Sequence, residues 1–520
     1  MFAIYIRFYI LAMESFKMMK ISNPFKNFGL NWGFWLGLIL FFYFLKFPIT
    51  EQLNPEAQHL FAIAVLMAIW WMTEALPLAV TSLLPLVLYP ILGIMKTSEI
   101  SPNYMNHLIF LFMGGFFIAE AIQKWGLHRR FALNTIYWMG KNTDRLILGF
   151  MLVAAFMSMW ISNTATAIML MPIGVAVIKQ LRTNDELIEP KTRSFETILM
   201  LAIAYGCSLG GTATLIGTPP NLVFAGIYRK FFQTQPEIYF SKWMIMILPL
   251  SCLLILIAYL FLVKIVLRKK DSPQIQNRDF LKGEIQKLGR LSIPQKRVLT
   301  VFIATALLWI FRGNIDFGSF KIPGWSNIIG LGDKIQDSTI AMAMAVLLFI
   351  IPGEKSGDND RKNILVIKDF VRIPWDILLL FGGGFALAEG IQKTGLADYI
   401  AQNLRILINL PLPLLLLIIC LSITLLTELT SNTAVAATFL PVLATFASHT
   451  NISPLILMLP ATIAASCAFM LPVSTPPNAI VFSTRYVSIK NMVSIGFALV
   501  LICSITIVLY FLLLNWLFPF

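Results

Sequence analysis

Apolar residues run through most of this 520-residue chain in stretches of the length that crosses a lipid bilayer. They occupy residues 31–48, 59–72, 76–95, 243–263 and 489–517. A helix of about 20 apolar residues spans the hydrocarbon core, where every backbone group must be paired within the structure. The pattern therefore predicts an all-α polytopic membrane protein.

Two short polar sequences interrupt the apolar stretches, and each occurs twice. Ser-Asn-Thr-Ala stands at 162–165 and 431–434, and Thr-Pro-Pro-Asn stands at 218–221 and 475–478. Polar, helix-breaking residues at membrane depth are tolerated where they line a cavity. These four segments are therefore the first candidates for a binding site.

The repetition extends beyond the polar segments. Ser-Asn-Thr-Ala recurs at an offset of 269, and Gly114–Leu127 matches Gly383–Leu396 at the same offset. Ten of these fourteen positions are identical, whereas composition alone gives about one. Pro172 and Pro441 keep the offset as well. We interpret the chain as an internal duplication.

Each predicted repeat contains an apolar pair of half-length segments with Ser-Asn-Thr between them, which favours a re-entrant hairpin. The boundaries that we expect are 1–54 for the N-terminal segment with a first transmembrane helix, 55–268 for the first repeat with a hairpin near 145–178, 269–295 for a cytoplasmic linker, and 296–520 for the second repeat with a hairpin near 411–447.

Charged residues predict how the repeats face the membrane. Residues 179–193, 264–297 and 353–372 carry Lys and Arg, whereas 447–454 carries neither. Positive loops stay on the cytoplasmic side. With the N-terminus cytoplasmic, about 11 transmembrane helices plus two opposed re-entrant hairpins satisfy this rule and put the C-terminus outside. The two repeats then have inverted topology, as in many secondary transporters.

Composition narrows the class further. Hydrophobic residues make up 58% of the chain and charged residues 13%, which excludes an ordinary soluble globule. The net charge of +14 comes from loop Lys and Arg, and without a basic stripe bearing exposed aromatics we expect no nucleic acid partner. The five cysteines and four histidines lack ligand spacing, so we expect no enzyme, metal centre or organic cofactor.

The two Ser-Asn-Thr segments offer oxygen ligands for a hard cation and donors for an anion. Each segment precedes a helix, whose N-terminal end favours negative charge. Simple helix capping is the alternative. At the Thr-Pro-Pro-Asn segments, paired prolines free preceding carbonyls, such as those of Gly217 and Ser474, to coordinate sodium. An inert kink is the alternative there.

Three acids lie in apolar surroundings. Glu120 and Glu389 are equivalent in the two repeats, and we slightly favour a bracing role, by hydrogen bonds to a hairpin backbone, over a functional one. Glu428 precedes the second Ser-Asn-Thr, and its counterpart is Met159. It either carries a proton or braces the tip.

These motifs and the basic linker resemble the divalent anion–sodium symporter family (solute carrier family 13) over nearly the whole chain after residue 30. The resemblance implies a homodimer in which a transport domain moves against a scaffold like an elevator. Carried over by position, it implies a first sodium site of Ser158, Ser162, Asn163 and Gly217, a second of Thr427, Thr430, Asn432 and Ser474, and substrate contacts from Asn163, Thr164, Thr218, Ser431, Asn432, Thr433, Thr475 and Pro476.

The resemblance implies sodium-coupled symport of C4-dicarboxylates such as succinate, malate or fumarate, with Na+ as the co-transported ion, in the cell (inner) membrane. Citrate, sulfate or an exchange mode remain open, and an anion channel is the alternative of another class. The membrane potential adds about 2.3 kcal/mol per charge at 100 mV. Importing a dianion with net inward positive charge therefore takes three or more sodium ions.

Overall fold

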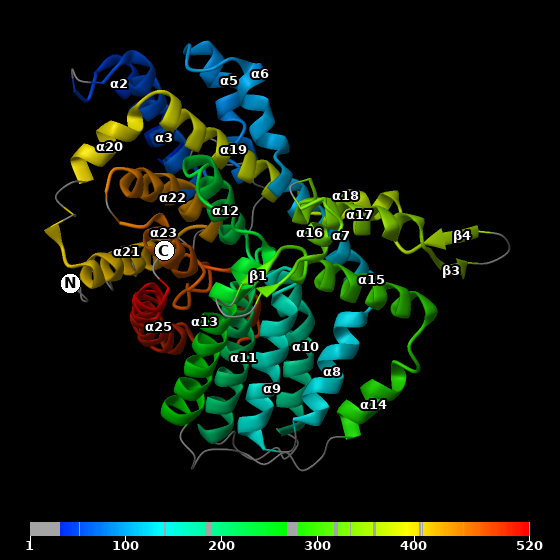
Figure 1. The fold of residues 1–520 in the computed structure, drawn as a ribbon. Coiled ribbons are helices and arrows are strands. Elements are labelled where there is room, and N and C mark those ends of the chain that lie inside the picture. The colour runs from blue at the N-terminus through cyan, green and yellow to red at the C-terminus, as the bar shows by residue number, and fades with distance from the viewer. Residues whose placement is uncertain are drawn as a thin grey trace.

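The computed structural model describes residues 32–50, 53–139, 142–181, 190–267, 279–316, 321–332, 334–356, 360–404, 407, 409–450 and 452–518. The predicted N-terminal segment up to residue 31, most of the charged stretch 179–193 and the first part of the linker, 269–278, lie outside the described residues. The described chain is predominantly helical (Figure 1).

The elements before the linker, in chain order, are α2 (Trp32–Lys46), α3 (Pro55–Thr73), α4 (Leu78–Thr81), α5 (Leu84–Ile91), α6 (Thr97–Ile100), the 3-10 helix η2 (Ser101–Met105), α7 (His107–Lys124), α8 (Leu127–Trp138), α9 (Thr143–Ser158), α10 (Asn163–Leu181), α11 (Pro190–Gly211), α12 (Pro219–Phe231), α13 (Phe240–Leu260) and the π-helix η3 (Phe261–Val266).

The later elements are α14 (Asp279–Lys287), α15 (Ile293–Ile310), β1 (Ile315–Asp316), β2 (Lys321–Ile322), α16 (Trp325–Ile328), α17 (Asp337–Ile350), β3 (Pro352–Ser356), β4 (Asp360–Asn363), α18 (Ile367–Arg372), α19 (Trp375–Lys393), α20 (Leu396–Leu404), α21 (Leu412–Thr427), α22 (Asn432–Ser448), α23 (Pro454–Ala464), α24 (Pro476–Ser483) and α25 (Ile489–Leu517). The strands form two antiparallel two-stranded hairpins, β1 with β2 and β3 with β4.

The helical, membrane-spanning class predicted from the sequence is confirmed. Within the described residues, six helices are long and apolar enough to cross a membrane by length and composition: Pro55–Thr73, Thr97–Lys124, Ser194–Gly211, Phe240–Val266, Ile293–Ile310 and Ile489–Leu517. Shorter apolar helices are Trp32–Lys46, Leu78–Ile91, Asp337–Ile350, Leu412–Thr427, Asn432–Ser448 and Pro454–Ala464. The predicted number of eleven crossings stays a prediction.

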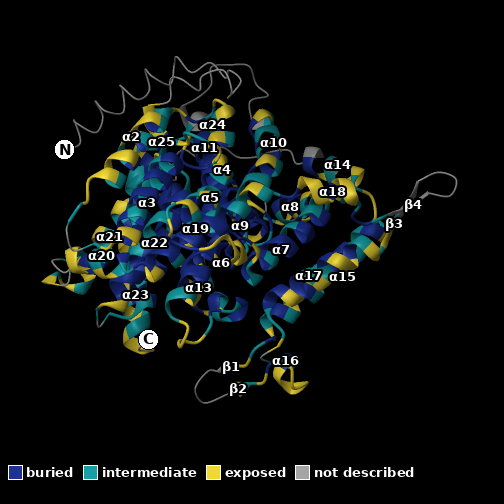
Figure 2. Ribbon diagram, turned by 90° about the horizontal axis from the view of Figure 1, so that it is seen from above, coloured by how far each residue is buried: buried dark blue, intermediate teal, exposed yellow. Residues whose placement is uncertain are grey.

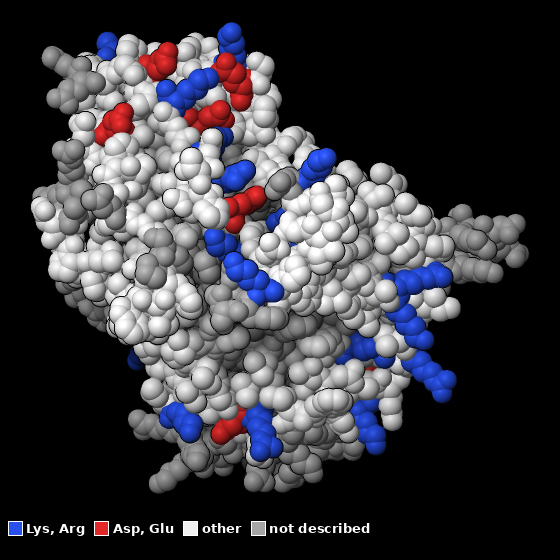
Figure 3. Space-filling view, viewed as in Figure 1, with Lys and Arg blue, Asp and Glu red and all other residues white. Residues whose placement is uncertain are grey.

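Burial fits a protein whose outer surface meets lipid. The centre of the bundle is fully buried, and exposed residues lie around its periphery (Figure 2). Large apolar side chains are nevertheless exposed, among them Ile91 at 71% and Trp516 at 77%. On the face shown in Figure 3, charged side chains lie in separate groups at the top, centre, right and bottom, and large areas between them carry none. Water cannot stabilise such apolar surfaces, but lipid can.

Close helix contacts organise the interior. α9 packs along α11, and α7 packs along α17. At the first crossing, a Cβ on Gly210 would lie 2.2 Å from the Cα of Ala155. At the second, a Cβ on Gly114 would lie 2.6 Å from the backbone carbon of Ala341. Small residues let membrane helices approach this closely, so their backbones make the packing contacts.

Candidate functional site

Both Ser-Asn-Thr segments lie between two helices of 16–19 residues. α9 ends at Ser158 and α10 begins at Asn163, whereas α21 ends at Thr427 and α22 begins at Asn432. Residues 159–162 and 428–431 therefore form two tips at the predicted places. The hydroxyl of Ser158 donates to Asn163 Oδ1, and the hydroxyl of Thr427 donates to Asn432 Oδ1 over 2.6 Å. Each tip thus has the same hydroxyl-to-amide hydrogen bond, at equivalent positions of the two repeats.

Both Thr-Pro-Pro-Asn segments begin a helix after a break. α11 ends at Gly211 and α12 begins at Pro219; α23 ends at Ala464 and α24 begins at Pro476. Proline is tolerated in the first helical turn because its missing N–H would have no helical partner there. We call residues 212–218 the first break and residues 465–475 the second break.

A buried asparagine braces each break. Asn221 Nδ2 donates to the carbonyls of Gly211, Thr212 and Thr214 over 2.7–3.3 Å. Asn478 Nδ2 donates to the carbonyls of Ala468 and Leu471 and to the hydroxyl of Ser474 over 2.9–3.2 Å. Both side chains are fully buried. These two amides therefore fix the backbone of each break through hydrogen bonds from the helix that follows it.

The first predicted sodium site is partly assembled. A Cβ on Gly211 would lie 2.6 Å from Asn163 Oδ1 and 3.2 Å from the carbonyl oxygen of Gly217, so both oxygens approach the same point. Ser158, fully buried, contacts the same Asn163 amide. Ser162 is exposed, and its hydroxyl accepts the N–H of Ala165 over 3.3 Å at the start of α10. We define the first cage as Ser158, Asn163 and the Gly217 carbonyl.

The second predicted site repeats the hydroxyl-to-amide contact of the first. Thr427 is fully buried and donates its hydroxyl to Asn432 Oδ1 and to the carbonyl of Ala465 over 3.1 Å. The hydroxyl of Ser474 donates to the Leu471 carbonyl over 2.7 Å within the second break. Thr430 Oγ1 donates back to the Leu426 carbonyl over 2.9 Å. We define the second cage as Thr427, Asn432 and Ser474.

The remaining predicted substrate residues lie at the helix starts beside the cages. Thr218 is buried without a side-chain cap bond, whereas Thr475 accepts the N–H of Asn478 over 3.3 Å. Thr164 and Thr433 follow the tips, Ser431 is the last residue of the second tip, and Pro476 is exposed at the start of α24. Packing is crossed between the halves, because α10 packs against α24 and α22 against α12. Among the described residues, no hydrogen bond joins Asn163 to Asn432.

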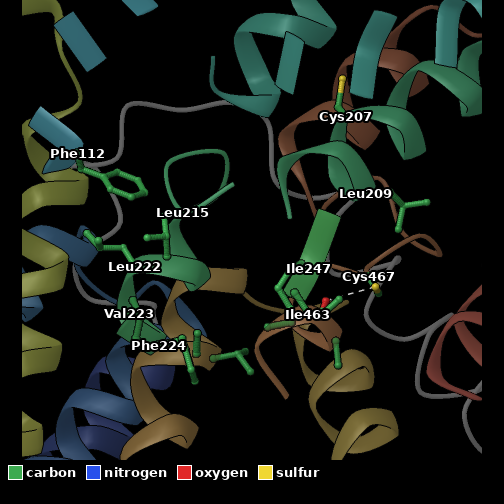
Figure 4. Packing of buried hydrophobic residues seen from close by; sticks show 14 of the residues in the cluster. Phe112, Cys207, Leu209, Leu215, Leu222, Val223, Phe224, Ile247, Ile463 and Cys467 are labelled. Carbon is green, nitrogen blue, oxygen red and sulfur yellow. Dashed lines mark hydrogen bonds between the residues drawn. The ribbon is translucent and has the colours of Figure 1, made fainter. Parts of the chain in front are cut away.

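Apolar side chains enclose both breaks. Figure 4 shows Leu215, Leu222, Val223 and Phe224 around the first break. In the second break, the thiol of Cys467 donates to the carbonyl of Ile463 over 3.3 Å. Hydrogen bonds and ion contacts are stronger in such low-dielectric surroundings than in water. The oxygens of the two cages therefore lie in surroundings where an ion contact would be stronger than in water.

The membrane acids Glu120 and Glu389 have side-chain partners on other elements. Glu389 accepts from Lys230 of α12 over 2.7 Å and from Asn103 over 2.6 Å. Glu120 lies 3.6 Å from Arg372 of α18. Both contacts join neighbouring elements. Among the described residues, these two carboxylates therefore pair with side chains, and not with a hairpin backbone as we had slightly favoured.

A pocket of about 620 Å³ lies between α10, α8 and α14. Ile161 and Ala165 line it beside the first tip, and Arg129 and Glu284, which form a 2.6 Å ion pair, line it farther out. In the second half the corresponding helices close up, because α22 packs against both α19 and α20. The first tip is therefore bordered by this pocket on one side, whereas helix α22 of the second half packs directly on its neighbours.

The cages suit an alkali-metal ion and not a transition metal. Their ligands are hydroxyl, amide and carbonyl oxygens, which hard cations prefer. In the part of the chain that the structure describes, no group of three His, Cys, Asp or Glu side chains could hold a metal ion. Two oxygen cages at helix breaks inside an apolar bundle are the construction that secondary membrane transporters use for ions and substrates.

The class defined by this fold is thus a polytopic membrane transporter. More specifically, the chain belongs to the sodium:sulfate symporter family, because residues 29–519 match the model of the sodium:sulfate symporter transmembrane region. The predicted membership of the divalent anion–sodium symporter family is thereby confirmed.

Curated relatives cover nearly the whole chain. The sodium-dependent dicarboxylate transporter SdcS of Staphylococcus saprophyticus subsp. saprophyticus is 40% identical over 502 residues, which are 95% of this chain and 93% of that protein. The protein of the same name from Staphylococcus aureus (strain bovine RF122 / ET3-1) is 40% identical over 496 residues, which are 95% of this chain and 92% of the relative.

Two solved transporters share the fold at low sequence identity. The YdaH transporter of Alcanivorax borkumensis has a TM-score of 0.54 at 15% identity, covering 81% of this chain and 88% of that one. The efflux pump MtrF of Neisseria gonorrhoeae has a TM-score of 0.52 at 12% identity, covering 91% and 97%. These likenesses concern the arrangement of helices alone.

Three residues escaped the sequence-based site prediction: Asn221, Asn478 and Gly211. Both asparagines stand in the repeated Thr-Pro-Pro-Asn, so the repetition was a usable signal for them. Gly211 has no such signal, because its counterpart is Ala468. Only the approach of the Asn163 amide shows why a side chain is absent there.

Proposed function

We propose that the chain is a secondary active transporter that imports C4-dicarboxylates such as succinate, malate or fumarate together with sodium ions. Relatives named sodium-dependent dicarboxylate transporters, 40% identical over 95% of the chain, support this cargo and this coupling ion. Citrate, sulfate and dicarboxylate exchange are the alternatives within the same fold.

The observation that carries the proposal is the pair of equivalent oxygen cages. Ser158 with Asn163 and Thr427 with Asn432 repeat the same hydroxyl-to-amide contact, and the backbone carbonyl of Gly217 adjoins the first pair. Each cage is suited to one sodium ion. No Lys or Arg occurs in either tip or either break, so bound sodium ions and helix N-terminal ends must offset the charge of a dianion.

In the proposed mechanism, sodium binding precedes and enables substrate binding. Sodium ions in the cages draw the Asn163 and Asn432 amides into fixed orientations and leave their Nδ2 donors for substrate carboxylates. Thr164, Thr433, Thr218 and Thr475 add hydroxyl donors from the four neighbouring helix starts, Ser431 adds one from the second tip, and Pro476 closes that side without competing as a donor. Without sodium, no bound cation would offset the two negative charges of the substrate carboxylates.

We further propose the membrane arrangement inferred from the charges: about eleven crossings, two opposed re-entrant hairpins, a cytoplasmic N-terminus and a homodimer in the cell (inner) membrane. The four-residue tips between helices of 16–19 residues support the hairpins. A pocket borders α10 and reaches α14 of the linker, whereas α22 packs directly on its neighbours. This difference supports a state in which the site is open on the side of the linker. Elevator movement of the hairpin-bearing part would open the other side.

Uptake into proteoliposomes tests the proposal. Purified protein is assayed with labelled succinate, malate, citrate and sulfate, with and without an inward sodium gradient. We expect saturable succinate uptake that requires sodium and carries inward positive current. Sodium-independent exchange of two dicarboxylates would contradict symport, and flux that does not saturate would indicate an anion channel.

A further inference from the structure

A buried carboxylate, Glu428, lies beside the second cage and has no acidic counterpart in the first. It is the first residue after α21, directly following Thr427, and it is fully buried. The equivalent position of the first tip is Met159. Buried carboxylates in membrane proteins are expensive to keep and therefore call for a specific function.

The carboxylate binds the second break. Its Oε1 accepts the N–H of Phe469 over 2.6 Å and that of Met470 over 2.9 Å, and its Oε2 accepts the N–H of Met470 over 3.0 Å and that of Leu471 over 3.1 Å. A carboxylate has only acceptors, and it matches this row of donors fully.

The first repeat joins its tip to its break with a neutral bond instead. Thr214 donates its hydroxyl to the backbone carbonyl of Met159 over 2.5 Å. The position equivalent to Thr214 is Leu471, which has no hydroxyl and donates its N–H to Glu428. The same connection is therefore made twice, once by a neutral pair and once by a carboxylate. The two cages differ by one negative charge in their surroundings.

We propose that Glu428 is a positioning residue for the second sodium ion and makes the second cage the tighter of the two. Its carboxylate fixes the break that carries Ser474 against the tip that carries Thr427 and Asn432. Its charge also attracts a cation across a low-dielectric interior. The inference rests on the proposed function, because it takes each cage to hold sodium.

The substitution Glu428→Gln tests the inference. Glutamine keeps the size, but its amide group turns a donor toward backbone N–H groups and loses the charge. We measure sodium binding by thermal shift of the purified protein, without transport, and succinate uptake in parallel. Loss of such a supporting group lowers metal affinity by about 10–100-fold. The sodium concentration at half-saturation should therefore rise at least about tenfold. The half-saturation for succinate at saturating sodium should change much less.

Met159→Gln is the matched control, since it puts the same side chain at the equivalent position of the neutral tip. We expect its sodium half-saturation to stay within about twofold of the unmodified protein. If Glu428→Gln also stays within that range, the inference is wrong. If the unmodified protein itself shows no sodium stabilisation, the proposed function fails instead, and the two failures are distinguishable.

A second pair of variants decides the question if Glu428→Gln does not fold. The unmodified protein should bind sodium in a tighter and a weaker phase. Asn432→Ala should remove the tighter phase, and Asn163→Ala should remove the weaker one. The opposite assignment, or two equal phases, would overturn the claim that the carboxylate strengthens the second cage.

Discussion

Asn221 and Asn478 illustrate how single residues prepare this site. Each uses its two amide hydrogens to hold oxygens of a break in place, including the carbonyl of Thr214 in the first and that of Leu471 in the second. A break inside a membrane bundle has no water to satisfy these oxygens, so a buried side-chain donor must. The carbonyl of Gly217 and the hydroxyl of Ser474 can then face the cages.

Replacing either amide by an acid should damage sodium binding. Asn221→Asp has nearly the same shape but sets an acceptor against three carbonyls that now accept from Nδ2. A buried polar group left unpaired costs about 1–3 kcal/mol, so we expect a lower melting temperature and a sodium half-saturation raised roughly tenfold. Asn478→Asp should behave alike. Both are measured by sodium-dependent thermal shift.

The control for these variants is Asn142→Asp, at the exposed start of α9, where the side chain makes no cap bond. It should leave the melting temperature and sodium half-saturation unchanged. If Asn221→Asp resembles this control, the asparagine is not a support of the break.

At the residue scale, repetition made most of the site predictable. Ser158 and Thr427 were named as sodium ligands from the family resemblance, and the structure puts each in a hydrogen bond with its asparagine, while their role as ligands stays a prediction. The partners of Glu428 were not predictable, because the N–H groups of Phe469, Met470 and Leu471 lie 41–43 residues away and carry no side-chain signal. Backbone donors become visible only when the fold is known.

At the scale of elements, the sequence pattern predicted the helix pairs well. The ranges 145–178 and 411–447 contain the helix pairs α9 with α10 and α21 with α22 within a few residues, whereas the re-entrant course of these pairs stays a prediction. Proline and apolar length are local signals, so these bounds could be read directly. The helices α8 and α20 have polar sequences without a membrane-length apolar pattern, so the apolar pattern alone does not mark them. The crossed packing of α10 on α24 depends on tertiary contacts and could not be predicted.

Substitution by alanine should affect stability very differently at two adjacent glycines of α7. A Cβ on Gly114 would lie 2.6 Å from the backbone of Ala341, whereas one on Gly115 would meet only the side chain of Ile216 at 3.6 Å. Overpacking costs about 1–3 kcal/mol, so Gly114→Ala should separate α7 from α17 and lower the melting temperature in detergent. Gly115→Ala should be neutral or stabilise by up to about 1 kcal/mol.

The equivalent glycines of α19 supply an independent comparison. Gly383 faces the backbone of Ser82 at 2.7 Å, whereas Gly384 meets the side chain of Ala437 at 3.4 Å. Gly383→Ala should therefore be the more damaging of the two. Equal melting temperatures for both pairs would show that these helix contacts are looser than described.

At the scale of the whole molecule, the account requires two halves that do one task together. Each half supplies a tip and a break, yet the helix after each tip packs against the helix after the break of the other half. Substrate bound among these helix starts would therefore contact both halves at once, and sodium in either cage would stabilise it. This reciprocal coupling between ion and substrate is what drives uphill uptake.

The most direct test of the central claim is sodium-driven uptake of labelled succinate into proteoliposomes by the unmodified protein, Asn163→Ala and Asn432→Ala, with Asn142→Ala as the control. Each cage variant loses an oxygen ligand and a substrate donor, so we expect at least about a tenfold loss of uptake at fixed sodium. The control should transport normally. Uptake by both cage variants equal to that of the unmodified protein would contradict the account.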